Sequence, residues 1–498
     1  MEAYKMAELD RRKIHKNSMF ASTPSTGSPS SRNAAGDTSS ETKSNSAKAV
    51  PPDRDVTRKL ARFIVTTKIE DVPSAVRKEA TRTLLNWLSV AVGGSHHPTI
   101  DNAIAAIAPF SGPAQASVMG RSERFDIIST TLINGMSSHV FDFDDTHLKT
   151  IIHASGPIIS PCLALSELLP ITGQEFLIAI TVGMETAFRI GNCVYPNHYD
   201  IGWHITGTAG SISAAAATGK LLKLDEQQMV WALGLGASQP VGLRESFGSM
   251  NKSFNPGRAG QNGLTASLLA EKNFTSSDLM IEAKRGWANT ISTKQDFLQI
   301  TEGLGHQWEA ALNTYKPFAC GIVIHPTIDA CIQLRNENNL SEDQIQKITL
   351  RVHPLVLELT GKKTPKVGLE GKFSVYHAAA VAIVEGKASE KQFSDQSVRT
   401  PAIISLRDRV TAIADTTIKE EQADVVILLK DGSTLHKFVK HAVGSLERPM
   451  SDDELNMKLM DLAEGILPKA QISRLNDSCW NIERLAQVAA LARLAIPS

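Results

Sequence analysis

A short stretch of this chain concentrates side chains that can do acid–base chemistry. Between Ser138 and Pro161 the sequence reads His139-Val-Phe-Asp142-Phe-Asp144-Asp145-Thr146-His147-Leu-Lys149-Thr-Ile-Ile-His153-Ala-Ser-Gly-Pro157. Carboxylates, imidazoles and ammonium groups are costly to bury, because each needs a partner or a shifted pKa. Apolar helical sequence lies on both sides of the stretch. We therefore interpret it as part of the active site of an enzyme.

Two other interpretations of this stretch stay open at this point. Asp142, Asp144, Asp145 and His147 are residue types that ligate divalent ions, although the glycine-centred loop of an EF-hand and the HExxH motif are both absent from the sequence. Alternatively, the carboxylates cap the end of a helix beside a solvated loop.

Three further polar motifs follow along the chain. His204 precedes a small-residue helix whose first amides, with Thr206, could receive an anion. Lys252 and Arg258 stand six apart in what reads as a Gly/Asn/Pro/Ser loop, a pattern that could clamp a carboxylate or phosphate. Lys316 falls where helical sequence gives way to mixed sequence. Each motif alone also fits a structural role. The segment at His204 could close a loop, Lys252 and Arg258 could be a solvated pair of cations, and Cys320, near Lys316, could be a small buried apolar residue.

The elements that must position these groups are mostly helices. From Asp53 to about Lys272, apolar residues recur at three- and four-residue spacing. The spacing predicts helices over 76–91 (ended by Gly93-Gly94), 126–141, 156–170, 174–190, 206–218 and 225–238.

The pattern changes after about residue 312. Ile348, Leu350 and Val352 alternate with polar residues as in a half-buried strand, and the segment around Asp431-Gly432 predicts two strands joined by a tight turn. Helical periodicity returns from Asp452. We predict a mainly α protein with a smaller α+β domain: a tail over 1–52, a helical domain over 53–312, an α+β lid over 313–450, and a return to the helical domain over 451–498.

Composition excludes several classes of protein. Lys plus Arg and Asp plus Glu number 52 each, which argues against a nucleic-acid or membrane-surface partner. The five cysteines include no CxxC pair, so neither a zinc site nor a disulfide framework is indicated, and we expect a reducing, intracellular setting. No run of about 18 apolar residues predicts a membrane span.

The first 50 residues are rich in Ser, Thr, Asn, Gly and Pro and are expected to be disordered. Arg11, Arg12 and Lys13 are compatible with a mitochondrial targeting peptide, but Glu8 and Asp10 are not typical of one. We therefore expect a plain tail and a cytoplasmic protein, with mitochondrial import as the alternative.

Taken in order, the motifs resemble those of the MmgE/PrpD family, which includes 2-methylcitrate and other alkylcitrate dehydratases and cis-aconitate decarboxylases. The resemblance is carried by Asp142-Phe-Asp-Asp-Thr146, His153-Ala-Ser-Gly-Pro, Gly-Trp-His204, Met-Asn-Lys252-Ser-Phe-Asn-Pro-Gly-Arg258, Tyr-Lys316-Pro-Phe and Glu370-Gly-Lys-Phe-Ser374. It runs from about Asp53 to the C-terminus. It implies a helical domain built from both chain ends, a smaller lid, a homodimer and chemistry without a metal or other cofactor.

Carried over by motif, the resemblance places the pocket on Asp142, Thr146, His153, His204, Lys252 and Lys316. Of these, Thr146 is expected to bind a substrate carboxylate. We add Arg258, Asp145 and His147 as substrate-binding candidates. Set beside these residues, the first stretch reads as one wall of an anion-binding acid–base pocket and no longer as a metal site.

The expected substrate is a small di- or tricarboxylate held by lysines, with His153 and His204 exchanging protons. Two reactions fit nearly equally: dehydration of a citrate or 2-alkylcitrate, placed first, and decarboxylation of cis-aconitate or an alkylated analogue. The His-Ala-Ser-Gly form is closer to the decarboxylase-like branch than to the dehydratases. A family member that binds tricarboxylates without turnover is the alternative from another class.

Overall fold

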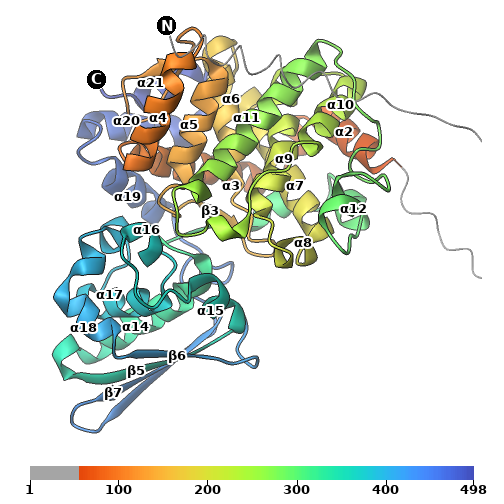
Figure 1. Ribbon diagram of the computed structural model, residues 1–498. Helices are drawn as coiled ribbons and strands as arrows, with labels where there is room; N and C mark the ends of the chain where they lie inside the picture. The colour runs from red at the N-terminus through yellow and green to blue at the C-terminus, as the bar shows by residue number, and fades with distance from the viewer. Residues whose placement is uncertain (1–54) are drawn as a thin grey trace, which may run out of the picture. The chain divides into compact units, whose positions relative to one another are not determined.

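The computed structural model describes residues 55–498. The predicted tail over 1–52, with its alternative as a targeting peptide, lies outside the described residues. Within them, helices predominate and a small mixed sheet occupies the second half of the chain (Figure 1). The predicted fold class, mainly α with a smaller α+β part, is confirmed.

The first half of the described chain is helical. Its helices are α2 (Val56–Thr66), α3 (Ser74–Gly94), α4 (Pro98–Ile107), α5 (Ile127–His139), α6 (Ser155–Leu168), α7 (Gly173–Val194), α8 (Asn197–Asp200), α9 (Ile205–Leu221), α10 (Glu226–Ala237), α11 (Asn251–Glu271), α12 (Trp287–Ile291) and α13 (Leu298–Thr301). The six helices expected from apolar spacing are α3, α5, α6, α7, α9 and α10. Capping explains some of their ends: Thr172 and Glu175 form a capping box that starts α7.

One expectation about this region is wrong. The segment around Lys252 and Arg258, predicted as a loop, belongs to helix α11. Its glycines do not mark turns: Gly257, Gly260 and Gly263 lie where α11 touches neighbouring helices, and a side chain there would collide with them. The composition that is typical of a loop therefore reflects close helix packing.

The C-terminal helices return to this helical part. They are α19 (Asp452–Ala463), α20 (Lys469–Trp480) and α21 (Ala489–Leu494). Helices α19 and α20 pack against α3, and α21 packs against α6 (Figure 1). One core cluster accordingly draws its residues from 56–315 and 450–495. The domain boundaries at 312 and 450 stay a prediction, which this distribution supports.

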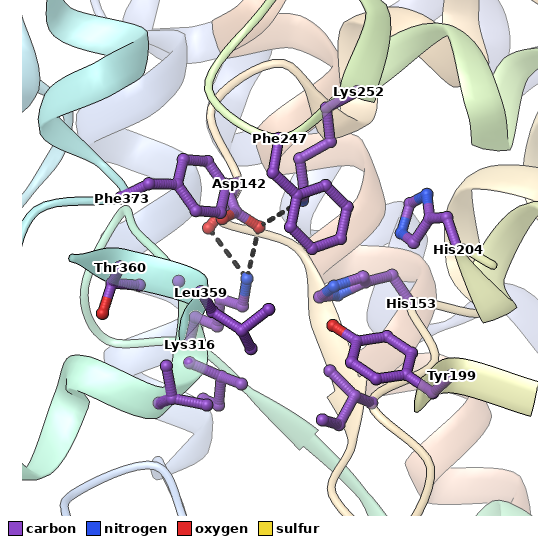
Figure 2. Close-up of a pocket in the computed structure, with 14 residues that line it drawn as sticks. Asp142, His153, Tyr199, His204, Phe247, Lys252, Lys316, Leu359, Thr360 and Phe373 are labelled. Atoms are coloured by element: carbon purple, nitrogen blue, oxygen red, sulfur yellow. Dashed lines mark hydrogen bonds and ion pairs between the residues drawn. The ribbon is translucent and has the colours of Figure 1, made fainter. Parts of the chain in front are cut away.

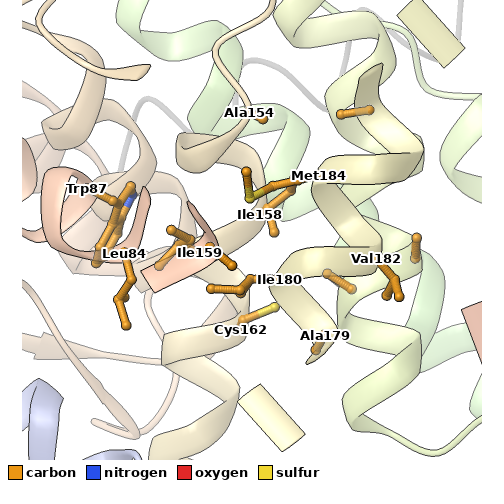
Figure 3. Packing of buried hydrophobic residues seen from close by; sticks show 14 of the residues in the cluster. Leu84, Trp87, Ala154, Ile158, Ile159, Cys162, Ala179, Ile180, Val182 and Met184 are labelled. Atoms are coloured by element: carbon orange, nitrogen blue, oxygen red, sulfur yellow. The ribbon is translucent and has the colours of Figure 1, made fainter. Parts of the chain in front are cut away.

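Helices α6 and α7 form the centre of this core. Ile158, Cys162 and Ile180 are buried in one cluster with Leu84 and Trp87 from α3 (Figure 3). Burying a Leu or Ile side chain stabilises a fold by about 1.5–3 kcal/mol. By length and composition, helix α7 is long and apolar enough to cross a membrane. However, 94% of its most apolar 18-residue stretch is buried inside the protein. Its hydrophobicity is thus that of a core helix.

The second half contains the mixed sheet. Strands β5 (Ile345–Val352), β6 (Val410–Ala414), β7 (Ala423–Leu429) and β8 (Thr434–Val439) lie in the order β6-β5-β7-β8. The expected hairpin is β7 with β8, and its turn includes Gly432 at φ 88°. Helices α14 (His325–Asn338) and α17 (Val375–Glu385) pack against the sheet (Figure 1). The other helices here are α15 (Pro354–Thr360), α16 (Gly368–Gly371) and α18 (Pro401–Arg407).

A short strand pair brings distant polar motifs together. Besides the small pair of β1 (Ala116–Ser117) with β2 (Arg124–Phe125), β3 (Asp145–His147) pairs antiparallel with β4 (Asn313–Tyr315). Lys316, which follows β4, therefore lies beside the segment that begins at Asp142. The buried ammonium of Lys458 on α19 fixes this junction, because it donates to the carbonyl oxygens of Phe143 and Lys316 over 2.6 and 3.0 Å.

Candidate active site

One pocket gathers the acid–base groups. It is lined by two lysines, two histidines and a carboxylate, which come from segments between residues 142 and 316 (Figure 2). The remaining wall is apolar or aromatic. The lining residues are Asp142, Ile151, His153, Tyr199, His204, Phe247, Lys252, Lys316, Gly321, Ile322, Val323, Leu359, Thr360 and Phe373.

Asp142 is the anchor of the charged groups. Its backbone is left-handed (φ 50°), a conformation that Asp tolerates better than most residues, and its amide donates to the carbonyl of His139. Its Oδ1 accepts from the ammonium groups of Lys252 (2.9 Å) and Lys316 (2.6 Å), as the dashed lines in Figure 2 mark. Burial would raise the pKa of Asp142, but the two ammonium charges outweigh it and hold the pKa well below its usual range. Asp142 is therefore a carboxylate.

Both lysines are buried. Lys316 is 1% exposed and also donates to the carbonyl oxygen of Asp142. Lys252 lies in the first turn of α11, with its ammonium 5.3 Å and 5.6 Å from the ring centres of Phe247 and Phe373. Burial lowers the pKa of Lys252, although Asp142 opposes the shift. Two cations that share one carboxylate leave net positive charge in the pocket, which suits an anionic ligand.

His153 presents a lone pair to the pocket. Its Nδ1 donates to the backbone carbonyl of Asp145 over 2.8 Å and lies 3.2 Å from the Thr146 hydroxyl. In a neutral imidazole this leaves Nε2 unprotonated, and Nε2 makes no hydrogen bond within residues 55–498. Burial, with Lys316 and Lys252 nearby, lowers the pKa of His153 to about 3. His153 is therefore neutral at pH 7.

His204 has the opposite tautomer. Its Nδ1 accepts from the side-chain amide of Asn255 over 2.9 Å, which leaves the proton on Nε2. Burial, reinforced by the charge of Lys252, holds the pKa of His204 well below its usual value. The pocket thus contains one imidazole that can accept a proton and one that can donate a hydrogen bond.

A second pair of residues supports Lys252 from behind. The Nδ1 of His139 donates to Oδ2 of Asp144 over 2.6 Å, and its Nε2 accepts from the Lys252 ammonium over 2.9 Å. All three side chains are buried. Burial lowers the pKa of His139, so its imidazole is neutral and can act as this acceptor.

The three imidazoles of His139, His153 and His204 offer nitrogens within 4.8 Å of one another, a spacing that a metal ion could bridge. These residues nevertheless fit a cation poorly. The Nε2 of His139 already accepts from the Lys252 ammonium. The ammonium of Lys316 is also close, because both lysines donate to Oδ1 of Asp142. A cation here would face two positive charges, whereas an anion would be attracted by them.

The pocket is closed in this conformation. Its free volume is about 30 Å³, enough for a water molecule but not for a tricarboxylate. Phe247 and Phe373 close one side, with ring centres 5.6 Å apart (Figure 2). Side chains in this wall must move before an organic acid can enter.

Comparison with known proteins identifies the family. Residues 58–299 match the MmgE/PrpD N-terminal domain, and residues 318–482 match the MmgE/PrpD C-terminal domain. The chain belongs to the MmgE/PrpD family. The predicted resemblance is thereby confirmed, and the family together with the relatives below supports a lyase.

Curated relatives of this MmgE/PrpD chain carry decarboxylase names. A cis-aconitate decarboxylase-like protein, oryM, from Aspergillus oryzae is 26% identical over 471 residues, covering 89% of this chain and 98% of the relative. The cis-aconitate decarboxylase of Aspergillus terreus is 25% identical (88% and 95% covered), and that of Homo sapiens is 23% identical (89% and 94% covered).

The structure brings five of the predicted site residues of this MmgE/PrpD chain into one pocket: Asp142, His153, His204, Lys252 and Lys316. Thr146 lies one layer behind, where its hydroxyl contacts His153 instead of the cavity. The roles of Thr146 and of the five pocket residues in a reaction stay predictions.

Besides Thr146, the other three predicted substrate-binding residues do not line the pocket either. Asp145 accepts from the amide of Ser155 and from Asn313, and His147 stacks on Phe188 with ring centres 4.2 Å apart. Arg258 is exposed and bonds to Gln261. For Arg258 the physical reason is helical geometry. Residues six apart on α11 point about 120° away from each other, at 3.6 residues per turn, so Lys252 and Arg258 cannot share one face.

Several pocket residues were missed from the sequence. Tyr199, Phe247, Thr360 and Phe373 are ordinary core-type residues in separate segments, and only the folded chain brings them together. His139 received no role from the sequence, and its partner Asp144 appeared only among the candidate metal ligands. A histidine five residues before an aspartate at the end of an apolar helix was the available signal.

Proposed function

We propose that this protein is a carboxy-lyase that decarboxylates cis-aconitate or a close analogue, without a cofactor. The observation that carries the proposal is the pair of buried ammonium groups on Asp142, beside two neutral imidazoles of opposite tautomer. The decarboxylase names of the relatives support it as well.

Binding comes first in this proposal. Lys252 and Lys316 attract the carboxylates of a tricarboxylate through charge-assisted hydrogen bonds, which are stronger than neutral ones. The Nε2–H of His204 adds a neutral donor. Because the bound trianion places negative charge near the imidazoles, it raises the pKa of His153 from its low value in the empty pocket. His153 thereby gains a proton when the substrate is present.

The chemical step breaks a carbon–carbon bond. The bond to the departing carboxylate cleaves, carbon dioxide leaves, and the electron pair delocalises through the double bond onto a remaining carboxylate. The lysine ammonium groups stabilise that developing charge. His153 then donates its proton to carbon. In balance, the trianion and one proton give carbon dioxide and an itaconate-type dianion.

Dehydration of a citrate-type substrate is the alternative. Loss of a hydroxyl needs a proton donor beside the leaving oxygen at the moment of bond cleavage. It also needs a base for the proton α to a carboxylate. Once the bound trianion has led His153 to take up a proton, neither imidazole that lines the pocket keeps a free lone pair, because Nδ1 of His204 already accepts from Asn255. Decarboxylation needs only the proton donor. This difference is why we place decarboxylation first.

The products decide between the two reactions. We expect the purified protein to release carbon dioxide from cis-aconitate and to leave 2-methylcitrate unchanged. A rise in enoate absorbance from 2-methylcitrate without carbon dioxide from cis-aconitate would establish dehydration instead. Lys252→Met should abolish the activity, whereas Lys272→Met, just beyond the end of the same helix and exposed, should retain it.

The same samples test the non-catalytic alternative. Calorimetry with cis-aconitate and with 2-methylcitrate reports binding whether or not a product forms. Tight binding of either compound by the wild type, with no product from any analogue, would show that the protein binds tricarboxylates and does not turn them over.

A further inference from the structure

A second cavity shares a wall with the acid–base pocket. Its volume is about 310 Å³, at the lower end of the range for small-molecule sites and about ten times that of the pocket. Ile151, Ile322 and Val323 line both spaces. These three side chains therefore form a wall shared by the space beside the reacting groups and a much larger volume.

Ile151 is held in this wall against its backbone preference. Its φ is 57°, a left-handed conformation that a β-branched residue rarely adopts. Two hydrogen bonds impose it: the Ile151 amide donates to the carbonyl of His147, and the His147 amide donates to that of Ile152, both over 2.8 Å. Strain of this kind persists where the position of a side chain matters. The strained turn thus places an isoleucine side chain in the wall that the two spaces share.

The character of the cavity defines what it can hold. Leu148, Ala442 and Val443 extend its apolar surface beyond the shared wall. Exposed carboxylates lie at the rim, on Glu420, Glu421 and Glu447, and they repel an anion. The ammonium of Lys149 in the same lining is already paired with Glu309. The second cavity is therefore unsuited to the carboxylates of a substrate and suited to an uncharged apolar group.

We propose that the second cavity receives an apolar substituent on the carbon skeleton of the tricarboxylate substrate, while the acid–base pocket holds the carboxylates. This inference rests on the proposed function for the choice of a tricarboxylate. Movement of the Ile151 and Ile322 side chains joins the two spaces when such a substrate binds. The protein thereby prefers alkyl-substituted tricarboxylates to cis-aconitate itself.

The test compares substrates that differ only in the length of an alkyl substituent. Each buried methylene contributes about 0.8 kcal/mol, so kcat/KM should rise about fourfold per added carbon over the first few carbons. Val443→Trp, and independently Leu446→Trp at the more exposed rim, should reduce the ratio of long-chain to unsubstituted kcat/KM to about one. Leu168→Trp, which adds bulk at the exposed end of α6, should preserve the ratio.

Affinity gives a readout that does not depend on turnover. Calorimetry with propane-1,2,3-tricarboxylate and its alkyl derivatives should show the same gain with chain length in the wild type and its loss in Val443→Trp. If cis-aconitate is decarboxylated but neither rate nor affinity increases with chain length, the second cavity is not a substrate site. If affinity increases while no substrate is turned over, the cavity assignment stands and the proposed reaction does not.

Discussion

A single buried carboxylate organises the charges of the pocket, and a second one organises what lies behind it. Asp142 fixes two lysines directly. Asp144 acts one step further away, because it fixes the tautomer of His139 and so makes Nε2 an acceptor for the Lys252 ammonium. With two of its N–H groups held by Asp142 and His139, Lys252 keeps one for a substrate. We infer that His139 and Asp144 are positioning residues.

Asp144→Asn tests this at the scale of one residue. The amide keeps the shape but loses the charge, so the His139 proton is no longer held on Nδ1 and Nε2 can carry it toward Lys252. We expect kcat to fall roughly ten- to a hundredfold, as is typical when the partner of a functional group is lost, with a smaller change in KM. The pH profile of kcat should also shift, which loss of packing alone would not cause.

Asp145→Asn is the matched control for this substitution. Asp145 is equally buried and adjacent, but its carboxylate accepts from Ser155 and Asn313 and not from an imidazole; its contact with His153 is made by the backbone carbonyl, which the substitution keeps. Burial raises its pKa to about 6, so losing its charge costs little. We expect kcat to stay within about twofold. Equal losses of kcat in the two variants would rule out a special role for the contact between His139 and Lys252.

At the scale of elements, helix α11 carries Lys252 into the pocket through close helix contacts. Its Gly257 faces the backbone of α5 at Leu132 and Met136, Gly260 faces α6, and Gly263 faces α9. The absence of side chains at these positions lets the helices approach closely enough to place the first turn of α11 beside Asp142.

Gly257→Ala should therefore destabilise the protein. A methyl group there would collide with the Leu132 carbonyl oxygen, which belongs to a helix backbone and cannot move aside. Overpacking of a core costs about 1–3 kcal/mol, more than the gain of up to about 1 kcal/mol from replacing a helical glycine. We expect a lower urea midpoint and, because α11 shifts, a lower kcat.

Gly219→Ala in α9 provides the comparison for this effect. A methyl group there would meet the flexible end of Met229 at 2.9 Å, which can move. Stability should be unchanged or slightly higher. A Gly257→Ala protein as stable and active as Gly219→Ala would show that the tight contact does not position α11.

The same helix shows what the sequence could reveal and what it could not. The apolar composition and spacing predict α3, α7 and α9, although these helices are buried on nearly all sides and not along one face. The glycines and Pro256 of α11 are typical of a loop, and the packing role of the glycines depends on neighbours about 50 to 125 residues away in the sequence. Motif order was sufficient to bring Asp142, His153, His204, Lys252 and Lys316 together, whereas Phe247 and Phe373 have no local signature.

At the scale of the whole molecule, the protein buries several imidazoles in neutral form. Beyond the pocket, His198 is buried beside Trp203 and Trp287, and His325 is buried against Phe318. Burial lowers the pKa of His198 and of His325 to about 3, as it does for His153. These groups tie the stability of the fold to pH.

The sign of the coupling follows from where protons bind. Between pH 6.5 and about 3, the unfolded chain binds protons at these histidines and the folded protein does not, so stability must fall as the pH falls through this window. Each histidine adds a slope of up to about 1.4 kcal/mol per pH unit. Urea midpoints should therefore decrease steadily from pH 6.5 toward pH 4.

His198→Gln should reduce that slope, because it removes one titrating group that lies outside the pocket. Thr208→Val is the control: it removes the hydrogen bond to His198 Nε2 but keeps the buried imidazole, so it should lower stability at every pH and preserve the slope. Urea midpoints at pH 4, 5, 6 and 7 measure both effects. A midpoint that does not change with pH, or the same slope in His198→Gln as in the wild type, would mean that burial of these imidazoles does not govern acid stability.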